Sequence, residues 1–270
     1  MIDGPADPIA DDADDTPTTQ VPGRNGMQWD SCGRSDPGKV RRINEDAFYD
    51  GGDKALWVVA DGMGGHSAGD VASHDIAEAF RLLDCPPRLS DFADLAESTL
   101  LALNGKFLEM ADYGREGATI GSTVVILAAR QDWMLLLWVG DSRIYRWREG
   151  RLQQLTQDHS QVEDLIASGM LLRENAEAHP AANVVTRAIG AAEDLYVDLD
   201  YCDVKAGDRY LLCSDGLTKE VGEDGIAAVL AGDADACGMC EALIAAALAT
   251  RARDNVTVVI TRALGYQGGG

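Results

Sequence analysis

The sequence has no long apolar run and no basic amino-terminal leader. None of its hydrophobic stretches approaches the roughly 20 residues that a membrane-spanning helix needs. Its first residues lack the basic cluster followed by an apolar segment that marks a secretion signal. We therefore expect a cytoplasmic protein with no membrane partner.

Positive charge is also scarce. The 270 residues include 23 lysines and arginines against 45 aspartates and glutamates, which gives a net charge of −22. This charge argues against nucleic acid or an anionic membrane as the main partner. It would also repel a phosphorylated substrate, unless bound divalent cations reverse the sign of the field locally. An acidic protein that handles phosphate therefore needs metal.

Cysteine is sparse, with six residues scattered along the chain. Cys237 and Cys240 have the spacing of a redox or zinc motif, but no second pair accompanies them, and they lie in an alanine-rich helical segment. In a chain of this length without a secretion signal, we expect reduced core thiols rather than a disulfide framework.

A single domain is expected to account for most of the chain, and we expect a monomer. Residues 1–26 are rich in Asp, Pro, Thr and Gly and have almost no large apolar side chain, which predicts a disordered acidic tail. The globular domain is expected over residues 27–264, followed by a flexible glycine-rich end at 265–270.

The apolar periodicity predicts helices near both ends of this domain and strands between them. Short strands joined by tight turns predict an antiparallel meander in the middle of the chain. A short helix and then a long polar loop are expected over residues 161–183, and such a loop is often functional. The helices are expected at 67–83, 90–112, 224–231 and 234–252, and the strands at 122–129, 133–139, 143–147, 151–155, 196–201, 209–213 and 255–261.

Acidic residues stand at the ends of apolar strands rather than on helix faces. Asp61 follows an apolar run and precedes glycines, and Asp215 repeats this arrangement downstream. Crowded carboxylates repel one another unless cations hold them, and hard oxygen ligands suit Mg²⁺ or Mn²⁺. We expect a shared site for two such ions, with Asp61 as the bridging ligand. The strand-end acids are Glu45, Asp46, Asp61, Asp141, Asp215 and Asp254.

Each of these residues has a plainer interpretation when taken alone. Asp-Gly is the commonest turn dipeptide, so Asp215 by itself indicates a turn. His66 by itself indicates a structural or surface histidine. Arg41 could grip phosphate oxygens with its planar guanidinium or form a structural ion pair with the acids after it, and spacing does not separate the two. The combination is what predicts a two-metal phosphatase.

A series of short motifs follows along the chain in a fixed order. They are Val40-Arg41-x-x-Asn44-Glu45-Asp46, Ala60-Asp61-Gly62-Met63-Gly64-Gly65-His66, Gly121-Ser122-Thr123, Gly140-Asp141-Ser142-Arg143, Leu155-Thr156-x-Asp158-His159-Ser160, Cys213-Ser214-Asp215-Gly216-Leu217 and Arg253-Asp254-Asn255. In this order and spacing they resemble the PPM (PP2C-type) metal-dependent protein serine/threonine phosphatases in their bacterial form. The resemblance implies an α+β fold, a β-sandwich of two antiparallel sheets flanked by α-helical layers. It also implies hydrolysis of phosphoserine and phosphothreonine by a metal-activated water, with no phosphoenzyme.

The resemblance also implies roles for individual residues. Asp61 bridges two core ions, Mn²⁺ or Mg²⁺, and Arg41 grips the phosphate. The remaining roles fall into three groups. Asp46 and the Gly62 carbonyl lie on one ion, Asp215 and Asp254 on the other, and Asp141 with Asp215 on a weaker third ion. Glu45 and Asn255 belong to the outer shell, and Gly169, Glu174 and His179 to a flap that shapes substrate access.

Two positions depart from the family pattern. Many eukaryotic relatives have a histidine, the proposed general acid, where this chain has Met63, and His66 is not assumed to replace it. The source of the leaving-group proton therefore stays open, with a third-metal water as one candidate. Ser122 stands where relatives usually have threonine, which we expect to be harmless.

The expected partners are phosphorylated proteins, with a cognate bacterial Ser/Thr kinase acting on the same substrates. Two other hypotheses compete with the phosphatase. One is a non-catalytic phosphoprotein-binding module that uses the same site, and the other is a cation-buffering protein that binds metal mainly through its acidic tail.

Overall fold

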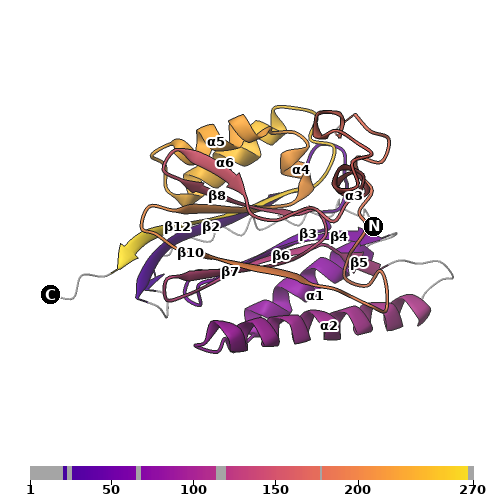
Figure 1. Cartoon of the computed structure of the whole chain (residues 1–270), viewed down its shortest axis with the longest axis horizontal. Helices are drawn as coiled ribbons and strands as arrows, with labels where there is room; N and C mark the ends of the chain where they lie inside the picture. Colours follow the sequence, from indigo (N-terminus) through magenta and orange to yellow (C-terminus); the bar gives the residue numbers. More distant parts are fainter. Residues whose placement is uncertain (1–20, 23–25, 65–67, 114–119, 177, 267–270) are drawn as a thin grey trace, which may run out of the picture.

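The structure is a computed structural model that describes residues 21–22, 26–64, 68–113, 120–176 and 178–266. Two antiparallel sheets lie face to face, and helices cover the outer face of each sheet (Figure 1). The predicted α+β fold, a β-sandwich between helical layers, is therefore confirmed.

The first sheet is organised around β12, the long strand near the carboxyl end of the chain. β12 pairs with β2 on one side, with a bulge between Ala263 and Gly265, and with β11 on the other. In spatial order this sheet consists of β1 (Val21–Pro22), β2 (Met27–Asp36), β12 (Val256–Tyr266), β11 (Arg209–Cys213), β8 (Arg143–Arg148) and β9 (Arg151–Gln154).

The second sheet has an apolar centre. Every residue of β6 is buried, and so is every residue of β7 except the first, because this sheet is covered on both faces. Its strands therefore form continuous apolar runs instead of an alternating pattern. In spatial order the sheet consists of β10 (Asp198–Asp203), β7 (Trp133–Val139), β6 (Val124–Arg130), β4 (Leu56–Gly64) and β3 (Asp46–Gly51), and β5 (Ile120–Ser122) pairs with the end of β4.

Helices form the outer layers of the molecule (Figure 1). The pair α1 (Ala68–Leu82) and α2 (Leu89–Tyr113) covers the second sheet, where α1 packs on β3 and β4. The pair α5 (Glu223–Ala231) and α6 (Ala236–Leu248) covers the first sheet, where α6 packs on β2 and β12. Within the described ranges, none of the helices has both the length and the hydropathy of a membrane span.

The sandwich has three apolar layers, one between the sheets and one under each helical pair. Between the sheets, the rings of Trp29 and Trp57 meet edge to face with their centroids 5.0 Å apart. Phe80 and Phe107 fill the layer under α1 and α2, and Leu243 belongs to the layer under α5 and α6. Packing in these layers fixes the positions of the strands, and the candidate site lies at one edge of the sandwich where several strands begin or end.

The strands in the middle of the chain do not form the single meander that we expected. β6 and β7 pair in the second sheet, whereas β8 and β9 pair in the first. The connection from β7 to β8 crosses between the sheets at Gly140, which has φ of +107°. Local turn signals do not show whether the next strand pairs with its predecessor or crosses over, because the apolar core decides this. As a result, Asp141 lies where the two sheets approach each other.

The expectation of reduced cysteines throughout is wrong. Cys32 in β2 and Cys237 in α6 form a disulfide with a Cα–Cα distance of 5.0 Å. The two residues are 205 positions apart and meet only because α6 packs across β2, so no local spacing could reveal the bond. Cys240 keeps its thiol, is buried, and donates to the carbonyl of Cys32 at 3.2 Å, so its expected packing role is confirmed.

The domain extends slightly beyond the boundaries that we expected. Val21–Pro22, which fall within the predicted disordered tail, pair with Gln28 and Trp29 of β2. At the other end, β12 continues to Tyr266 and therefore includes the first residues of the predicted flexible end. Residues 1–20 and 267–270 lie outside the described ranges, and their predicted disorder stays a prediction.

Candidate metal and phosphate site

Asp46 and Asp61 are register partners across β3 and β4. Directly opposed residues of an antiparallel pair project to the same face, with Cβ atoms about 5 Å apart. Asp46 is buried, and Asp61 is partly exposed where β4 leaves the core. The pairing of the two strands therefore places two carboxylates side by side at the end of the second sheet.

Two further acids come from the first sheet. Asp215 follows β11 and begins the short helix α4 (Asp215–Thr218), and Asp254 lies just before β12. Ser214 connects the two sheets, because its hydroxyl donates to Asp46 Oδ2 at 2.8 Å and accepts from the amide of Thr257 at 3.0 Å. The acids of both sheets therefore meet at one edge of the sandwich.

The crossover between the sheets fixes Asp141. The amide of Gly140 donates to His159 Nδ1 at 3.0 Å, and the amide of His159 donates to the Gly140 carbonyl at 2.9 Å. The hydroxyls of Ser142 and Thr123 lie 2.7 Å apart and tie the crossover to β6. A rigid turn thus holds Asp141 beside the other acids.

The backbone of Asp61 is held just as firmly. Its carbonyl accepts from the Thr123 amide at 2.9 Å and from the Ser122 hydroxyl at 2.9 Å. Ser122 thus makes a hydrogen bond that a threonine hydroxyl could also make, which agrees with the expectation that this departure is harmless.

Most of the predicted residues line a single cavity of about 230 Å³. Asp46, with only 4% of its surface exposed, is not among the residues that line it. The residues around the cavity are Arg41, Glu45, Asp61, Gly62, Met63, Gly64, Thr123, Asp141, Val185, Asp215, Asp254 and Asn255.

The crowding of these acids changes their protonation. Burial, followed by the nearby charges of other carboxylates, raises the pKa of Asp46 to about 6 and that of Asp141 to about 7. Burial also raises the pKa of Asp61 well above its ordinary value, with Asp46 as the strongest neighbouring charge. Such shifts mark a cluster of carboxylates that favours bound positive charge.

The donor set fits divalent cations. Asp215 Oδ1 is buried and has no hydrogen-bond partner, although a buried carboxylate oxygen normally has one. All the acids offer hard oxygen ligands, which suit Mn²⁺ or Mg²⁺. Among the described residues, no group of three or more His, Cys, Asp or Glu side chains is already placed to hold a metal ion. The protein's own cations lie against two of the acids, Arg41 against Asp254 and Lys219 against Asp215. The acids would have to exchange these partners to bind a metal.

Gly62, Glu45 and Asn255 all line the cavity. The Gly62 amide donates to the Glu45 carbonyl at 2.9 Å, and a Cβ on Gly62 would come within 2.1 Å of the Gly69 carbonyl oxygen. Only glycine fits there. Asn255 accepts from the Glu45 amide at 2.9 Å and donates to the carbonyls of Pro37 and Ile43, both at 3.0 Å. It therefore fixes the segment that carries Arg41 and Glu45.

Arg41 forms an ion pair, although its partner is Asp254 and not one of the acids that closely follow it in the sequence. Its guanidinium lies 2.9 Å from Asp254 Oδ1, and 49% of its side chain is exposed. It also lines the cavity, so the ion pair does not prevent it from reaching an anion there.

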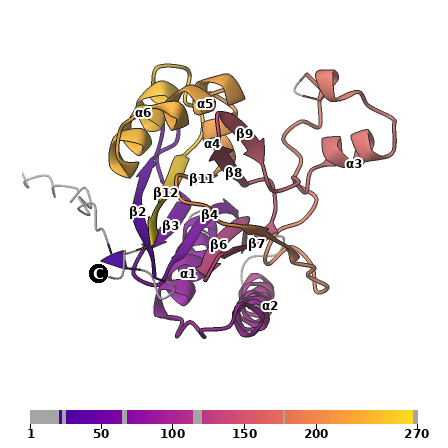
Figure 2. The same cartoon turned by 60° about the vertical axis from the view of Figure 1, so that its left-hand side comes forward.

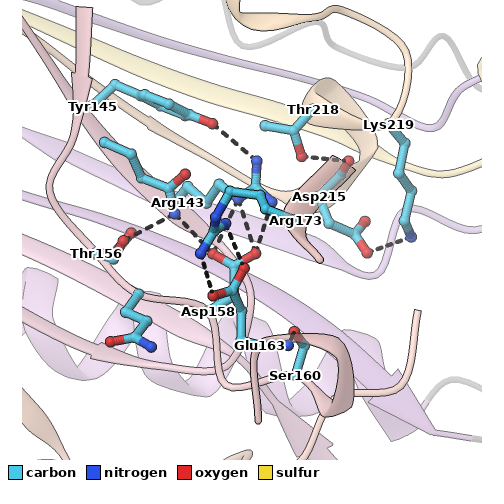
Figure 3. Close-up of polar contacts among 12 residues, drawn as sticks. Arg143, Tyr145, Thr156, Asp158, Ser160, Glu163, Arg173, Asp215, Thr218 and Lys219 are labelled. Carbon is cyan, nitrogen blue, oxygen red and sulfur yellow. Dashed lines mark hydrogen bonds and ion pairs between the residues drawn. The ribbon is translucent and has the colours of Figure 1, made fainter. Parts of the chain in front are cut away.

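Our sequence reasoning missed Lys219. Its ammonium forms an ion pair with Asp215 (Figure 3). It also forms one with Asp254 Oδ2, at 3.5 Å. Burial lowers the pKa of Lys219, but the charge of Asp215 and the hydrogen bond to it outweigh burial and raise it overall. The spacing of four residues between Asp215 and Lys219 is a signal that we could have used, because such residues are neighbours on a helix.

Arg143 and Asp158 form a second support that the sequence analysis did not assign. Arg143 Nε donates to both oxygens of Asp158 at 3.0 Å, and its Nη1 donates to the Tyr145 hydroxyl at 3.0 Å (Figure 3). Asp158 immediately precedes His159, so this ion pair anchors the segment that holds the Asp141 turn.

The segment from α3 (Gln161–Ala167) through the short helix η1 (Arg173–Asn175) projects away from the sandwich (Figure 2). An ion pair between Arg173 and Glu163 holds the two helices together. None of the three predicted flap residues, Gly169, Glu174 and His179, lines the cavity of the acids. Val185, just beyond this segment, does line it.

Two positions bear on the source of the leaving-group proton. Met63 lines the cavity beside Asp61, so a thioether occupies the position where many eukaryotic relatives have histidine. His66 lies outside the described residues.

Comparisons with known proteins agree with this geometry. The family model for protein phosphatase 2C matches residues 39–249. The serine/threonine protein phosphatase PstP of Mycobacterium tuberculosis is 34% identical over 236 residues, which cover 87% of this chain and 45% of PstP. This chain thus spans about half the length of that relative. It belongs to the protein phosphatase 2C family.

Solved structures give the same result. PppA of Pseudomonas aeruginosa superposes with a TM-score of 0.81 at 38% identity, covering 87% of this chain and 97% of that one. The catalytic domain of PstP in complex with two manganese ions superposes with a TM-score of 0.77 at 34% identity, covering 87% and 97%.

Proposed function

We propose that this chain is a Mn²⁺- or Mg²⁺-dependent phosphatase that hydrolyses phosphoserine and phosphothreonine on proteins. Its physiological counterpart would be a bacterial Ser/Thr kinase that phosphorylates the same substrates. The proposal also keeps the cytoplasmic location that the sequence predicts. PstP is named as a serine/threonine protein phosphatase, which favours catalysis over the non-catalytic binding module.

One observation carries the proposal. The register pair Asp46 and Asp61 comes from one sheet and Asp215 from the other, and Asp215 keeps a buried oxygen without a partner. A protein gains no stability from carboxylates crowded in this way. The arrangement is useful only if cations bind there.

The acids would bind the metal ions, and Arg41 would bind the phosphate. Asp61, Asp46 and the Gly62 carbonyl would hold one ion, Asp61, Asp215 and Asp254 the other, and Asp141 with Asp215 a weaker third. When bound, such ions lower the pKa of a water molecule so that it attacks phosphorus at neutral pH. Arg41 binds the phosphate oxygens and orients the ester, and Asn255 holds the segment that carries Arg41. The exposed mouth of the cavity between Arg41 and Val185 admits the substrate.

A direct assay tests this proposal. The purified protein should release phosphate from a phosphothreonine peptide when Mn²⁺ is present, and EDTA should stop the release. Calorimetric titration of the same sample with Mn²⁺ shows whether the site is loaded. If folded, metal-bound protein binds the peptide without turning it over, the non-catalytic module is correct and the phosphatase is refuted.

The cation-buffering hypothesis is separated by a truncation. It predicts that deletion of residues 1–26 removes most of the bound metal. We expect this deletion to leave the tight Mn²⁺ sites unchanged, because all the ligands named above lie within the sandwich.

A further inference from the structure

A second cavity adjoins the one that contains the acids. It has a volume of about 480 Å³, and both Arg41 and Asp254 line both cavities. The other residues around it are Asn183, Gly216, Lys219, Glu220, Arg251 and Arg253.

This second cavity is basic, although the chain as a whole carries a net charge of −22. Arg41, Lys219, Arg251 and Arg253 outnumber its two acids. Arg41 and Lys219 are already engaged with Asp254, the first at 2.9 Å and the second at 3.5 Å. Within the described part of the chain, the guanidinium groups of Arg251 and Arg253 form neither an ion pair nor a side-chain hydrogen bond. Two exposed arginines are therefore available beside the active site.

The second acid, Glu220, forms no ion pair with these arginines among the described residues, although its pKa is lowered by the hydrogen bond from Thr250 and, to a smaller extent, by the charge of Arg253. Its carboxylate accepts from the Thr250 hydroxyl at 2.6 Å and from the backbone amide of Arg253 at 3.4 Å. Glu220 thus holds the backbone of the loop, and within the described ranges the guanidinium of Arg253 has no direct hydrogen bond or ion pair.

The loop that presents the arginines is constrained. Ala252, between them, is fully buried and has φ of +40°, a left-handed conformation that costs a non-glycine residue about 1 kcal/mol. Lys39 holds it in place, because its amide donates to the Ala252 carbonyl at 2.8 Å and its ammonium to the Thr250 carbonyl at 3.1 Å. With Ala252 turned inward, both neighbouring arginines face solvent. The backbone is therefore strained at Ala252, the residue whose conformation exposes the two arginines.

We propose that this cavity binds a second anionic group, a phosphate or a carboxylate, on the same protein segment whose phosphate enters the active site. The inference rests on the proposed phosphatase function and adds a substrate class to it. Because the two cavities share Arg41, the two anionic groups must be close in the substrate, within a few residues of an extended segment at about 3.3 Å per residue. Planar guanidinium groups suit phosphate and carboxylate oxygens.

The test compares three peptides with the Mn²⁺-loaded protein. One carries a single phosphothreonine between neutral residues, one has a second phosphothreonine nearby, and one has a glutamate at that position. The second position is scanned over three residues on either side. Each peptide is measured for KM and kcat and, by fluorescence anisotropy, for binding.

The variant is the double substitution Arg251→Gln with Arg253→Gln. Its matched control is Arg88→Gln with Arg151→Gln, which removes the same charge from two exposed arginines outside both cavities. Thermal midpoints verify that both variants fold.

We expect the second anionic group to lower the wild-type KM about fivefold to tenfold at its best position, with little change in kcat. The Arg251/Arg253 variant should lose this preference while it keeps the wild-type KM for the single phosphothreonine, and the control should keep the preference. A wild-type KM that falls only with the second phosphothreonine supports the site and identifies phosphate as its anion. A KM that falls with the second phosphothreonine and also with the glutamate supports the site and shows that it accepts either anion.

Equal KM values for all three peptides in the wild type, or a preserved preference in the Arg251/Arg253 variant, overturns the inference. If the wild type turns over none of the peptides, the phosphatase proposal fails. The anisotropy data then still decide whether the second anionic group is bound through these arginines.

Discussion

Asp46 and Asp61 face each other across β3 and β4, and the hydroxyl of Ser214 reaches Asp46 from the opposite sheet at 2.8 Å. The position of the acids therefore depends on strand register within one sheet and on packing between the two sheets. A slip of one residue in β3 would turn Asp46 to the other face and dismantle the pair. The predictions below test what this arrangement does.

Asp61→Asn should nearly abolish turnover. The substitution keeps the shape of the side chain but removes the charge that the bridging role needs, and loss of several kcal/mol of transition-state stabilisation lowers kcat about 10³-fold or more. Asp215→Asn should behave alike. Metal-free samples of both variants should be at least as stable as the wild type, since burial raises the pKa of each carboxyl and so penalises its ionised form. Near-normal turnover in a folded variant would contradict the two-metal assignment.

The stability of the EDTA-treated protein should fall as the pH rises from about 4 to about 7. Asp46 and Asp141 have pKa values of about 6 and about 7 in the folded protein, against an ordinary value of 3.8. Over this range the folded state holds protons that the unfolded chain has released, so raising the pH favours unfolding. Thermal midpoints in a pH series check this trend.

The matched control for the pH series is Asp46→Asn, which should flatten the slope. Mn²⁺-loaded protein should show the opposite trend, because metal binding requires deprotonated ligands and strengthens as the pH rises. A midpoint that rises with pH in EDTA-treated wild type would show that other ionisable groups dominate.

The sequence was sufficient for the parts of this picture that depend on local pattern. Apolar periodicity located both helical pairs, and the ends of the apolar runs located Asp61, Asp215 and Asp254. The strand ends were informative because a sandwich brings strand ends together, so acids placed there meet even when far apart in sequence.

What the sequence did not reveal depends on tertiary contacts. The crossover at Gly140 and the bond between Cys32 and Cys237 both arise because packing joins segments whose local patterns are ordinary. Lys219 was missed because a lysine after an Asp-Gly turn is typical of a surface helix, and only the approach of Asp254 makes it part of the site.

Lys219→Met should strengthen Mn²⁺ binding. The ammonium now neutralises Asp215 and Asp254, so a metal ion has to displace it, and methionine fills similar space without charge. We expect the dissociation constant for Mn²⁺, measured by calorimetry, to fall about fivefold, as for loss of one partly exposed ion pair. Lys205→Met is the control, since in the described part of the chain Lys205 forms an ion pair with Asp203 and lines neither cavity. Weaker Mn²⁺ binding in Lys219→Met would mean that the lysine supports the loaded site.

Arg41→Ala and Asn255→Ala should separate phosphate binding from the scaffold that supports it. Arg41 is half-exposed, so its loss should raise KM for a phosphothreonine peptide about tenfold or more and leave the thermal midpoint almost unchanged. Asn255 is buried and makes three hydrogen bonds to the backbone of residues 37–45. Its loss should raise KM as well, but it should also cost about 2 kcal/mol or more in the free energy of unfolding, since backbone groups lose their partner. Denaturant unfolding together with steady-state kinetics on both variants checks the distinction. An unchanged KM in Arg41→Ala would show that Arg41 serves only in its ion pair with Asp254. Another residue would then have to bind the phosphate.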